Sequence, residues 1–158
     1  MRFNKNVSVD LYNVHCNAGS DNADYAARRK NIEQLCEYIN TYSADKAIIL
    51  MGDFNCRYTR VQDNIRKIDS LGFKNVWIEL TRNGIAPLQN GNSLTDCSTN
   101  TTSPTCEVVD KIFYRSNSQI TLTPTFYQLD DARFYDVDSL PLSDHRPMNA
   151  KFRYTIHP

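Results

Sequence analysis

The stretch that decides the fold is residues 47–55, which read Ala-Ile-Ile-Leu-Met-Gly-Asp-Phe-Asn. The first five residues form a continuous apolar run, which is typical of a strand buried on both faces of a sheet. The run ends at Gly52, and the polar residues Asp53 and Asn55 follow at once. A carboxylate directly after a buried strand is not a typical surface charge, so the end of this strand is a candidate functional site.

The segments before this strand predict a βαβ unit. Residues 7–15 alternate apolar and polar side chains and predict a strand. Residues 25–42 carry apolar side chains at the i, i+3, i+4, i+7 spacing of an amphipathic helix. These are Ile32, Leu35, Cys36 and Ile39. A strand, a helix and a buried strand in this order predict two adjacent parallel strands.

The rest of the chain is expected to hold one more helix and several strands. A helix is predicted near residues 61–71, with Gly72 as its left-handed C-terminal cap. Residues 73–80 are predicted as a short strand, and the polar residues 81–106 as one long loop, a kind of segment that is often functional. Strands are also predicted at 107–114, 119–127 and 148–155. The expected fold class is therefore α/β (α+β), a βαβ unit followed by a β-rich segment.

Composition places the chain among ordinary globular proteins. It has 158 residues, 41% of them hydrophobic and 23% charged. Lys plus Arg and Asp plus Glu number 18 each, and this neutral total carries no electrostatic signature of nucleic-acid binding. No run of about 18 apolar residues occurs, so no transmembrane segment is expected. The N-terminus lacks the apolar region of a signal peptide and leads directly into the first predicted strand.

Five cysteines leave at least one thiol unpaired. Cys97 and Cys106 flank a Ser/Thr-rich loop without apolar anchors, where a disulfide clip is favoured over two exposed thiols. The same loop holds the glycosylation sequon Asn100-Thr101-Thr102. Together with the tyrosine content, a clip and a sequon favour a secreted protein. Cys36 lies on the apolar face of the predicted helix and is interpreted as core.

Polar residues collect where the predicted parallel strands end. His15 ends the first strand, and Asp53 and Asn55 follow the second. In open α/β sheets, ligands bind at the carboxyl ends of the strands, so these three side chains are expected on one rim. The alternative is a solvated Asp53 at a strand end, with Asn55 in a turn.

Two further segments carry candidate catalytic groups. Asp144 and His145 lie side by side before the last predicted strand and offer a metal-binding carboxylate and an imidazole that titrates near neutrality. Asp110 interrupts an apolar strand, and an imidazole is the obvious partner for such a carboxylate. The alternatives are an ordinary loop around His145, and an Asp110 that faces solvent and pairs with a lysine.

These motifs together resemble the endonuclease/exonuclease/phosphatase superfamily, which includes DNase I-like nucleases and neutral sphingomyelinases. The resemblance rests on Gly-Asp-Phe-Asn at residues 52–55, Val-Asp-Lys-Ile-Phe at 109–113 and Ser-Asp-His-Arg-Pro at 143–147. The resemblance runs from His15 to the last strand, and the sequences of these segments are most similar to those of secreted fungal members. It implies one half of a DNase I-like four-layer α/β sandwich.

The resemblance also implies roles for the site residues. Asp53 would orient or deprotonate the attacking water, and Asn55 would bind a phosphate oxygen. His145, oriented by Asp110, would act on the scissile phosphate as an acid or base, and His15 would assist the leaving group. Asp144 would lie at or near a Mg²⁺ (or Mn²⁺) site. The implied substrate is a phosphoester, either a nucleic acid, a phospholipid or an inositol phosphate, and phosphodiester hydrolysis with a divalent cation fits these roles.

The chain departs from the family pattern in one respect. Family domains are longer, and their first half supplies a metal-binding Asn and the Glu of a Gln-Glu motif that this chain lacks. Residues 1–158 are therefore interpreted as a single partial domain with the N-terminal half apparently absent. Half a sandwich leaves an apolar sheet face uncovered, which predicts self-association. The alternative function is a non-catalytic truncated domain or pseudo-enzyme that acts as a binding or self-associating module.

Two cysteines permit a different chemistry. Cys16 and Cys56 each follow a candidate site residue, and they could be two unpaired thiols or a disulfide. A third reading makes one of them a nucleophile beside His145 and Asp110, which would give a thiol hydrolase. Three arginines near the motifs, Arg57, Arg60 and Arg146, are candidates for phosphate contact, or otherwise solvated surface residues.

Overall fold

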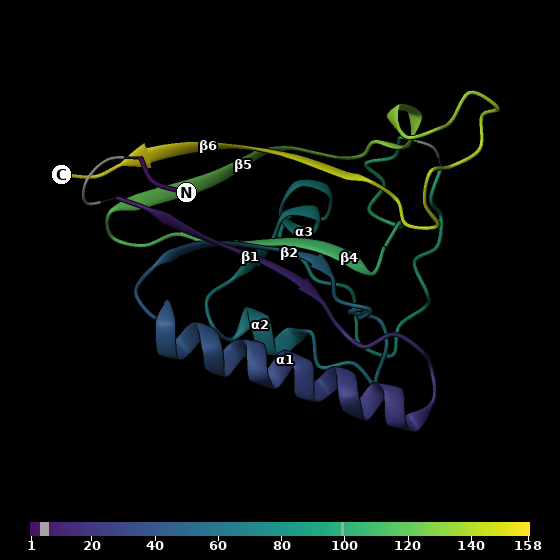
Figure 1. The fold of residues 1–158 in the computed structure, drawn as a ribbon, viewed down its shortest axis with the longest axis horizontal. Coiled ribbons are helices and arrows are strands. Elements are labelled where there is room, and N and C mark those ends of the chain that lie inside the picture. The colour runs from purple at the N-terminus through teal and green to yellow at the C-terminus, as the bar shows by residue number, and fades with distance from the viewer. Residues whose placement is uncertain (4–6, 99) are drawn as a thin grey trace.

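A computed structural model of the chain describes residues 1–3, 7–98 and 100–158. One four-stranded sheet carries the helices α1 (Asn22–Tyr42) and α2 (Arg66–Asp69) on one face and a two-stranded sheet on the other (Figure 1). The elements are β1 (Val9–His15), α1 (Asn22–Tyr42), β2 (Ala47–Asp53), α2 (Arg66–Asp69), β3 (Lys74–Asn75), α3 (Val76–Thr81), β4 (Asp110–Arg115), β5 (Ile120–Leu129), the 3₁₀ helix η1 (Asp131–Arg133) and β6 (Met148–Ile156). This confirms the expected α/β class.

The predicted βαβ unit is confirmed. Strands β1 and β2 are parallel neighbours, paired in register from Val9 with Ala47 to His15 with Asp53. Helix α1 begins with a capping box, in which the Asp21 carboxylate accepts the Asp24 N–H at 2.9 Å and the Asp24 carboxylate accepts the Asp21 N–H at 3.2 Å. The predicted apolar face of α1 provides its buried residues, and its Cys36 is confirmed as core.

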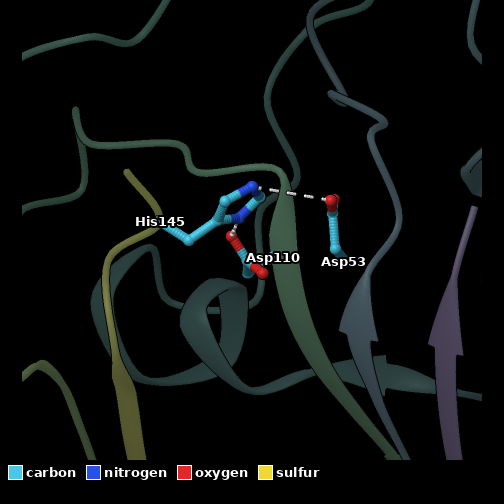
Figure 2. Close-up of side chains that lie close together, drawn as sticks. All are labelled: Asp53, Asp110 and His145. Atoms are coloured by element: carbon cyan, nitrogen blue, oxygen red, sulfur yellow. Dashed lines mark hydrogen bonds and ion pairs between the residues drawn. The ribbon is translucent and has the colours of Figure 1, made fainter. Parts of the chain in front are cut away.

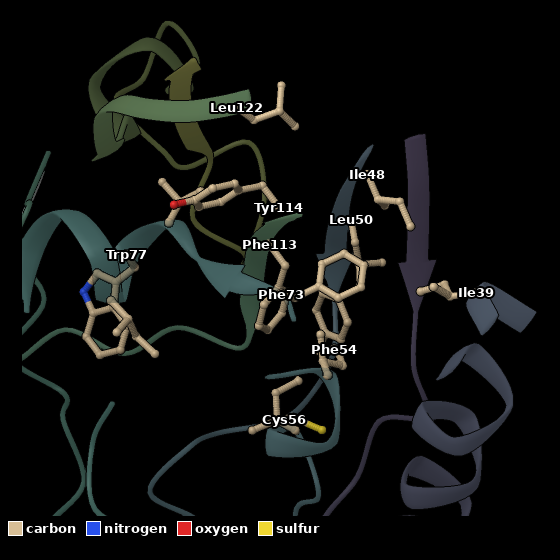
Figure 3. Close-up of a cluster of buried hydrophobic side chains, with 14 of the residues drawn as sticks. Ile39, Ile48, Leu50, Phe54, Cys56, Phe73, Trp77, Phe113, Tyr114 and Leu122 are labelled. Carbon is tan, nitrogen blue, oxygen red and sulfur yellow. The ribbon is translucent and has the colours of Figure 1, made fainter. Parts of the chain in front are cut away.

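The sheet order β1-β2-β4-β3 brings the candidate residues to one edge. Strand β4 is antiparallel to β2, and Asp53 pairs with Asp110. The loops after β1 and β2, the start of β4 and the segment before β6 gather at the end of the molecule opposite the two termini (Figure 1). The buried side chains between sheet and helices include Ile39, Leu50, Phe54 and Phe113, and the last two rings pack edge to face (Figure 3).

Two local predictions were wrong. The helix predicted over residues 61–71 is confined to α2, because Asp63 turns inward to a buried ion pair with Arg28 and holds the preceding residues in turns. The cap at Gly72 is confirmed by its φ of 80°. The strand predicted over residues 73–80 is only β3, because the Asn75 side chain accepts the Ile78 N–H at 3.3 Å and starts α3.

The two-stranded sheet covers part of the second face. Strands β5 and β6 are antiparallel, and Phe152 packs against Tyr114 of β4 with ring centroids 5.6 Å apart. Leu11 and Met51 share this face but are 51% and 36% exposed. Self-association through this open part stays a prediction.

Among the described residues, no helix is long and apolar enough to cross a membrane.

Candidate active site

Strand pairing aligns three candidate side chains at the edge of the sheet. His15 is paired with Asp53 across β1 and β2, and Asp53 is paired with Asp110 across β2 and β4. Residues directly opposite each other project from the same face of a sheet, so the three side chains stand in one row. His15 and Asp53 therefore lie on one rim, as the sequence predicts, and Asp110 joins them there.

His145 completes the arrangement from the segment before β6. Its Nδ1 lies 2.8 Å from Asp110 Oδ2, and its Nε2 lies 3.7 Å from Asp53 Oδ2 (Figure 2). The hydrogen bond that His145 Nδ1–H donates to Asp110 is the main reason that the His145 pKa is raised above its ordinary value, and the Asp110 charge adds to it. The imidazolium therefore persists to higher pH than in a free histidine.

Asn55 is fixed against Asp53 by the local backbone. Its N–H donates to Asp53 Oδ1 at 2.7 Å, and its Nδ2 donates to Asp53 Oδ2 at 2.9 Å and to the Cys16 carbonyl at 3.0 Å. Asn55 has a φ of 51°, a left-handed conformation that asparagine tolerates better than most residues. Gly52 is required before it, because a Cβ there would lie 2.0 Å from the Val14 carbonyl oxygen.

His15 and Asp144 lie at the margins of the cluster. His15 Nε2 is 3.4 Å from Asp53 Oδ2, and its side chain is 77% exposed. Asp144 is exposed and lines a cavity of about 320 Å³ beside the site, together with Arg57, Asp110 and His145. The metal role predicted for Asp144 stays a prediction.

The clustered residues offer ligands for a cation. Asp53, Asp110 and His145 each present one ligand atom, and these atoms lie within 4.8 Å of one another. The carboxylates, with substrate and water oxygens, suit Mg²⁺ or Mn²⁺, and the imidazole would add a ligand only in its neutral form. The donor set therefore fits the divalent ion that the motifs imply.

Comparison with known proteins identifies the family. The sequence model of "Endonuclease/Exonuclease/phosphatase family 2" matches residues 1–151. The chain belongs to this family. Sphingomyelinases of Mycobacterium bovis and Mycobacterium tuberculosis are each 32% identical to it over 160 aligned positions, which cover 98% of this chain and 29% of theirs. The chain thus spans less than a third of the length of these curated relatives.

Solved structures support the fold of this family member. A humanized D. rerio TDP2 superposes with a TM-score of 0.59 at 18% identity, over 94% of this chain and 54% of that one. D. rerio TDP2 in complex with a single-strand DNA product gives 0.57 at 20% identity, over 90% and 55%. The DNase I-like fold predicted from the motifs is therefore shown.

The cysteines of this family member include one disulfide pair and buried free thiols. The predicted Cys97–Cys106 disulfide is present, with the Cα atoms 4.8 Å apart. Cys16 and Cys56 are free and buried, and burial raises the pKa of Cys16 to about 11 and that of Cys56 to about 12. Such thiols stay protonated at neutral pH, which argues against the thiol hydrolase. Secretion of the chain stays a prediction.

The arginines near the motifs are engaged inside the protein. Arg57 donates to the Glu107 carbonyl, and Arg60 donates to the Asn55 carbonyl at 3.2 Å and to Asp63 at 3.0 Å. Arg146 pairs with Asp131. In these contacts the three arginines bind residues of the protein behind the open rim. The contacts therefore support the residues around the site.

Sequence reasoning missed the buried charges that support the site. Glu107 and Lys111 form an ion pair at 3.3 Å, with side chains 0% and 3% exposed. Lys111 is the neighbour of Asp110 but pairs with Glu107, so the alternative in which a lysine neutralises Asp110 is not the arrangement found for that carboxylate. The sequence offered one signal of this ion pair, namely two oppositely charged residues, Glu107 and Lys111, beside a predicted apolar strand.

Proposed function

We propose that this chain supplies the acid–base groups of a metal-dependent phosphoester hydrolase that activates water for attack on phosphorus. The observation that carries the proposal is the convergence of Asp53, Asp110 and His145 at the end of the sheet. Membership of the endonuclease/exonuclease/phosphatase family supports it. So do the relatives named sphingomyelinase.

The residues take separate roles in this proposal. Asp53, next to Asn55 and open toward both histidines, orients the water and accepts its proton. His145 is held by Asp110 and donates a proton to the leaving oxygen, and the pKa of His145, raised by the hydrogen bond with Asp110, favours its protonated form. The Asn55 amide, with both protons donated to Asp53 and the Cys16 carbonyl, keeps the Asp53 carboxylate oriented, and the exposed His15 imidazole assists the leaving group.

A divalent cation fits beside these groups. The exposed Asp144 carboxylate, which lines a cavity with Asp110 and His145, would be the residue to hold it. When bound, the cation stabilises the negative charge that develops on phosphorus-bound oxygens. The chain's own groups position the water and move the protons.

Chelation is expected to remove the activity. Hydrolysis of bis-p-nitrophenyl phosphate by the purified chain should fall to the level of the buffer in EDTA, and excess Mg²⁺ or Mn²⁺ should restore it. Initial rates measured at several metal concentrations check this. Equal turnover with and without EDTA would contradict metal dependence. No turnover with any divalent ion would favour the non-catalytic binding module instead.

Exposed apolar residues beside the site favour a lipid phosphodiester as the substrate. Residues 134–142, named here the apolar hairpin, are joined by a bridge between Tyr135 and Pro141 and by the Leu142 N–H to the Phe134 carbonyl at 2.9 Å. Its side chains are 46% exposed at Phe134, 100% at Val137, 60% at Leu140 and 64% at Leu142. Phe134 and Leu142 also line a cavity of about 420 Å³ next to His145.

Such a surface suits a substrate with hydrocarbon chains. Burying one exposed aliphatic side chain contributes about 1.5–3 kcal/mol, so a few of them suffice to hold a membrane surface near the site. The relatives named sphingomyelinase support a phospholipid substrate in particular. The acidic side chains of the hairpin, Asp136 and Asp138, favour an uncharged or zwitterionic surface over an anionic one.

Acidic residues in the apolar hairpin are expected to impair lipid hydrolysis selectively. The double variant Val137→Asp/Leu140→Asp should lose at least about tenfold in turnover of sphingomyelin in vesicles, since two apolar contacts are replaced by charges. Hydrolysis of bis-p-nitrophenyl phosphate should change less than about twofold. Ile85→Asp, at a residue 68% exposed outside the hairpin, is the matched control. Equal loss on both substrates would sink the lipid assignment.

A further inference from the structure

Arg146 directly follows His145, and its side chain is held within the protein. Its Nε donates to Asp131 Oδ1 at 2.9 Å, and its Nη2 pairs with Asp131 Oδ2, so the pair is bidentate. The Nη2 group also donates to the Ser98 carbonyl at 2.6 Å, and Nη1 lies 3.8 Å from Cys106 Sγ. The side chain is 22% exposed.

Asp131 is itself fixed from the other side. Its Oδ2 accepts the Asn100 N–H at 2.9 Å, and the Asn100 side chain accepts the Ala132 N–H at 3.0 Å. The hydrogen bonds from Arg146 are the main reason that the Asp131 pKa lies below its ordinary value. A carboxylate that stays ionised over a wide pH range keeps this ion pair intact.

Two further partners of Arg146, Ser98 and Cys106, belong to a covalently closed loop. The clip loop, defined as residues 97–106, is closed by the Cys97–Cys106 disulfide and includes residue 99, which lies outside the described residues. It presents the Ser98 carbonyl and the Cys106 sulfur to Arg146, and the Asn100 N–H to Asp131. The clip loop, Asp131 and Arg146 thus form one closed network.

This network borders the catalytic imidazole. Pro147, two residues after His145, accepts the Asp130 N–H at 2.8 Å, so the chain is anchored to residues 130–131 at both positions 146 and 147. On the other side, the His145 N–H is bonded to Ser143 Oγ at 3.0 Å. The imidazole that emerges between these anchors reaches Asp110 at 2.8 Å. About 1 Å of displacement at a catalytic group can cost a hundredfold in rate.

We propose that Arg146 is a positioning residue, whose bidentate pair with Asp131 and contacts with the disulfide-closed clip loop hold His145 against Asp110. The inference rests on the proposed function, in which His145 is catalytic. It differs from the phosphate-binding role considered from the sequence, because a substrate phosphate would have to displace Asp131 from the guanidinium. Arg146 acts through His145 and does not touch the reacting atoms.

The test reads the His145–Asp110 hydrogen bond without turnover. In protein labelled with ¹⁵N-histidine, the Nδ1-bound proton of His145 is expected as a downfield signal that Asp110→Ala removes. Arg146→Met and Asp131→Asn should lose this signal while circular dichroism stays unchanged. Arg146→Lys keeps the charge and should recover part of it. Arg133→Met, which removes an exposed arginine paired with Asp130 at 3.6 Å, is the matched control and should keep it.

Variants of the clip loop provide an independent test of the proposal. Cys97→Ser/Cys106→Ser should weaken the signal as Arg146→Met does, whereas Cys36→Ala, outside the loop, should not. A full-strength signal in both Arg146→Met and the double serine variant would overturn the proposal, whether or not the chain turns over any substrate.

Kinetics separate positioning from substrate binding. For a soluble phosphodiester, Arg146→Met should lower kcat by about 10- to 100-fold and change KM by less than about threefold. A raised KM with unchanged kcat would instead identify Arg146 as a substrate contact and overturn the proposal. An inactive wild type that shows the downfield signal would count against the proposed function alone.

Discussion

Replacing Asp53 by asparagine is expected to lower kcat by at least about 1,000-fold, since the variant loses the group that accepts the proton of water. The Asp53 carboxylate accepts two hydrogen bonds from Asn55 and lies 3.4 Å from His15 and 3.7 Å from His145. An amide is neutral, and one of its two polar atoms donates instead of accepting. It therefore cannot satisfy both Asn55 donors or take up a proton.

The measurement is the initial rate of bis-p-nitrophenyl phosphate hydrolysis at saturating Mg²⁺, with thermal unfolding recorded for the same samples. Asp10→Asn is the matched control, because Asp10 lies in β1 and binds the Ser43 hydroxyl at 2.6 Å on the helix-covered face. Its turnover should stay within about twofold of the wild type. Wild-type turnover in Asp53→Asn would show that the site assignment is wrong.

The part of the fold that could be predicted is the part written in local patterns. The apolar run at 47–51 and the helical spacing through Ile32 and Ile39 are each readable within a few residues, and they predicted β1, α1 and β2 with their parallel pairing. The 61–71 helix failed because a long-range contact, between Arg28 and Asp63, outweighs the local period. The 73–80 strand failed because one capping side chain, Asn75, changes the element type.

The candidate site also has residues that could be predicted from local sequence and residues that could not. Asp53 and Asn55 were predictable because they end a buried strand, and Asp110 because it interrupts an apolar one. The expected imidazole partner of Asp110 is confirmed in His145. Asp131 was not predictable, because nothing in its neighbouring residues distinguishes a buried partner from a surface acid, and the only signal for Glu107 was its place beside an apolar strand with Lys111. Their importance comes from contacts with Arg146 and Lys111 that only the folded chain creates.

The buried pair of Glu107 and Lys111 ties two parts of the site together. Glu107 accepts the Tyr58 N–H at 2.5 Å and the Thr59 hydroxyl at 3.1 Å, so it holds the segment after Asn55. Lys111, the sequence neighbour of Asp110, donates to Glu107 at 3.3 Å and to the Val108 carbonyl at 2.6 Å. Burial lowers the pKa of Lys111 although the Glu107 carboxylate lies beside it, because a buried ammonium is disfavoured.

Glu107→Gln is therefore expected to lower the free energy of unfolding by about 3–5 kcal/mol near pH 7, since it leaves a buried ammonium without its counter-charge. Urea denaturation followed by circular dichroism measures this. Glu33→Gln, which breaks an exposed pair with Lys67, is the matched control and should cost less than about 1 kcal/mol. A loss in Glu107→Gln no larger than in this control would mean that the pair is not a structural anchor.

The pH dependence and a double variant identify the unpaired lysine as the cause. In Glu107→Gln, the Lys111 pKa of the folded state lies below that of the unfolded state, so the unfolded chain binds more protons and stability should rise as the pH rises toward the ordinary lysine pKa of about 10.4. Adding Lys111→Met removes the buried charge itself. Glu107→Gln/Lys111→Met should therefore recover more than about half of the loss and have a flatter pH profile. A double variant less stable than Glu107→Gln would place the stabilisation in the contact between Lys111 and Val108, and not in the charge pair.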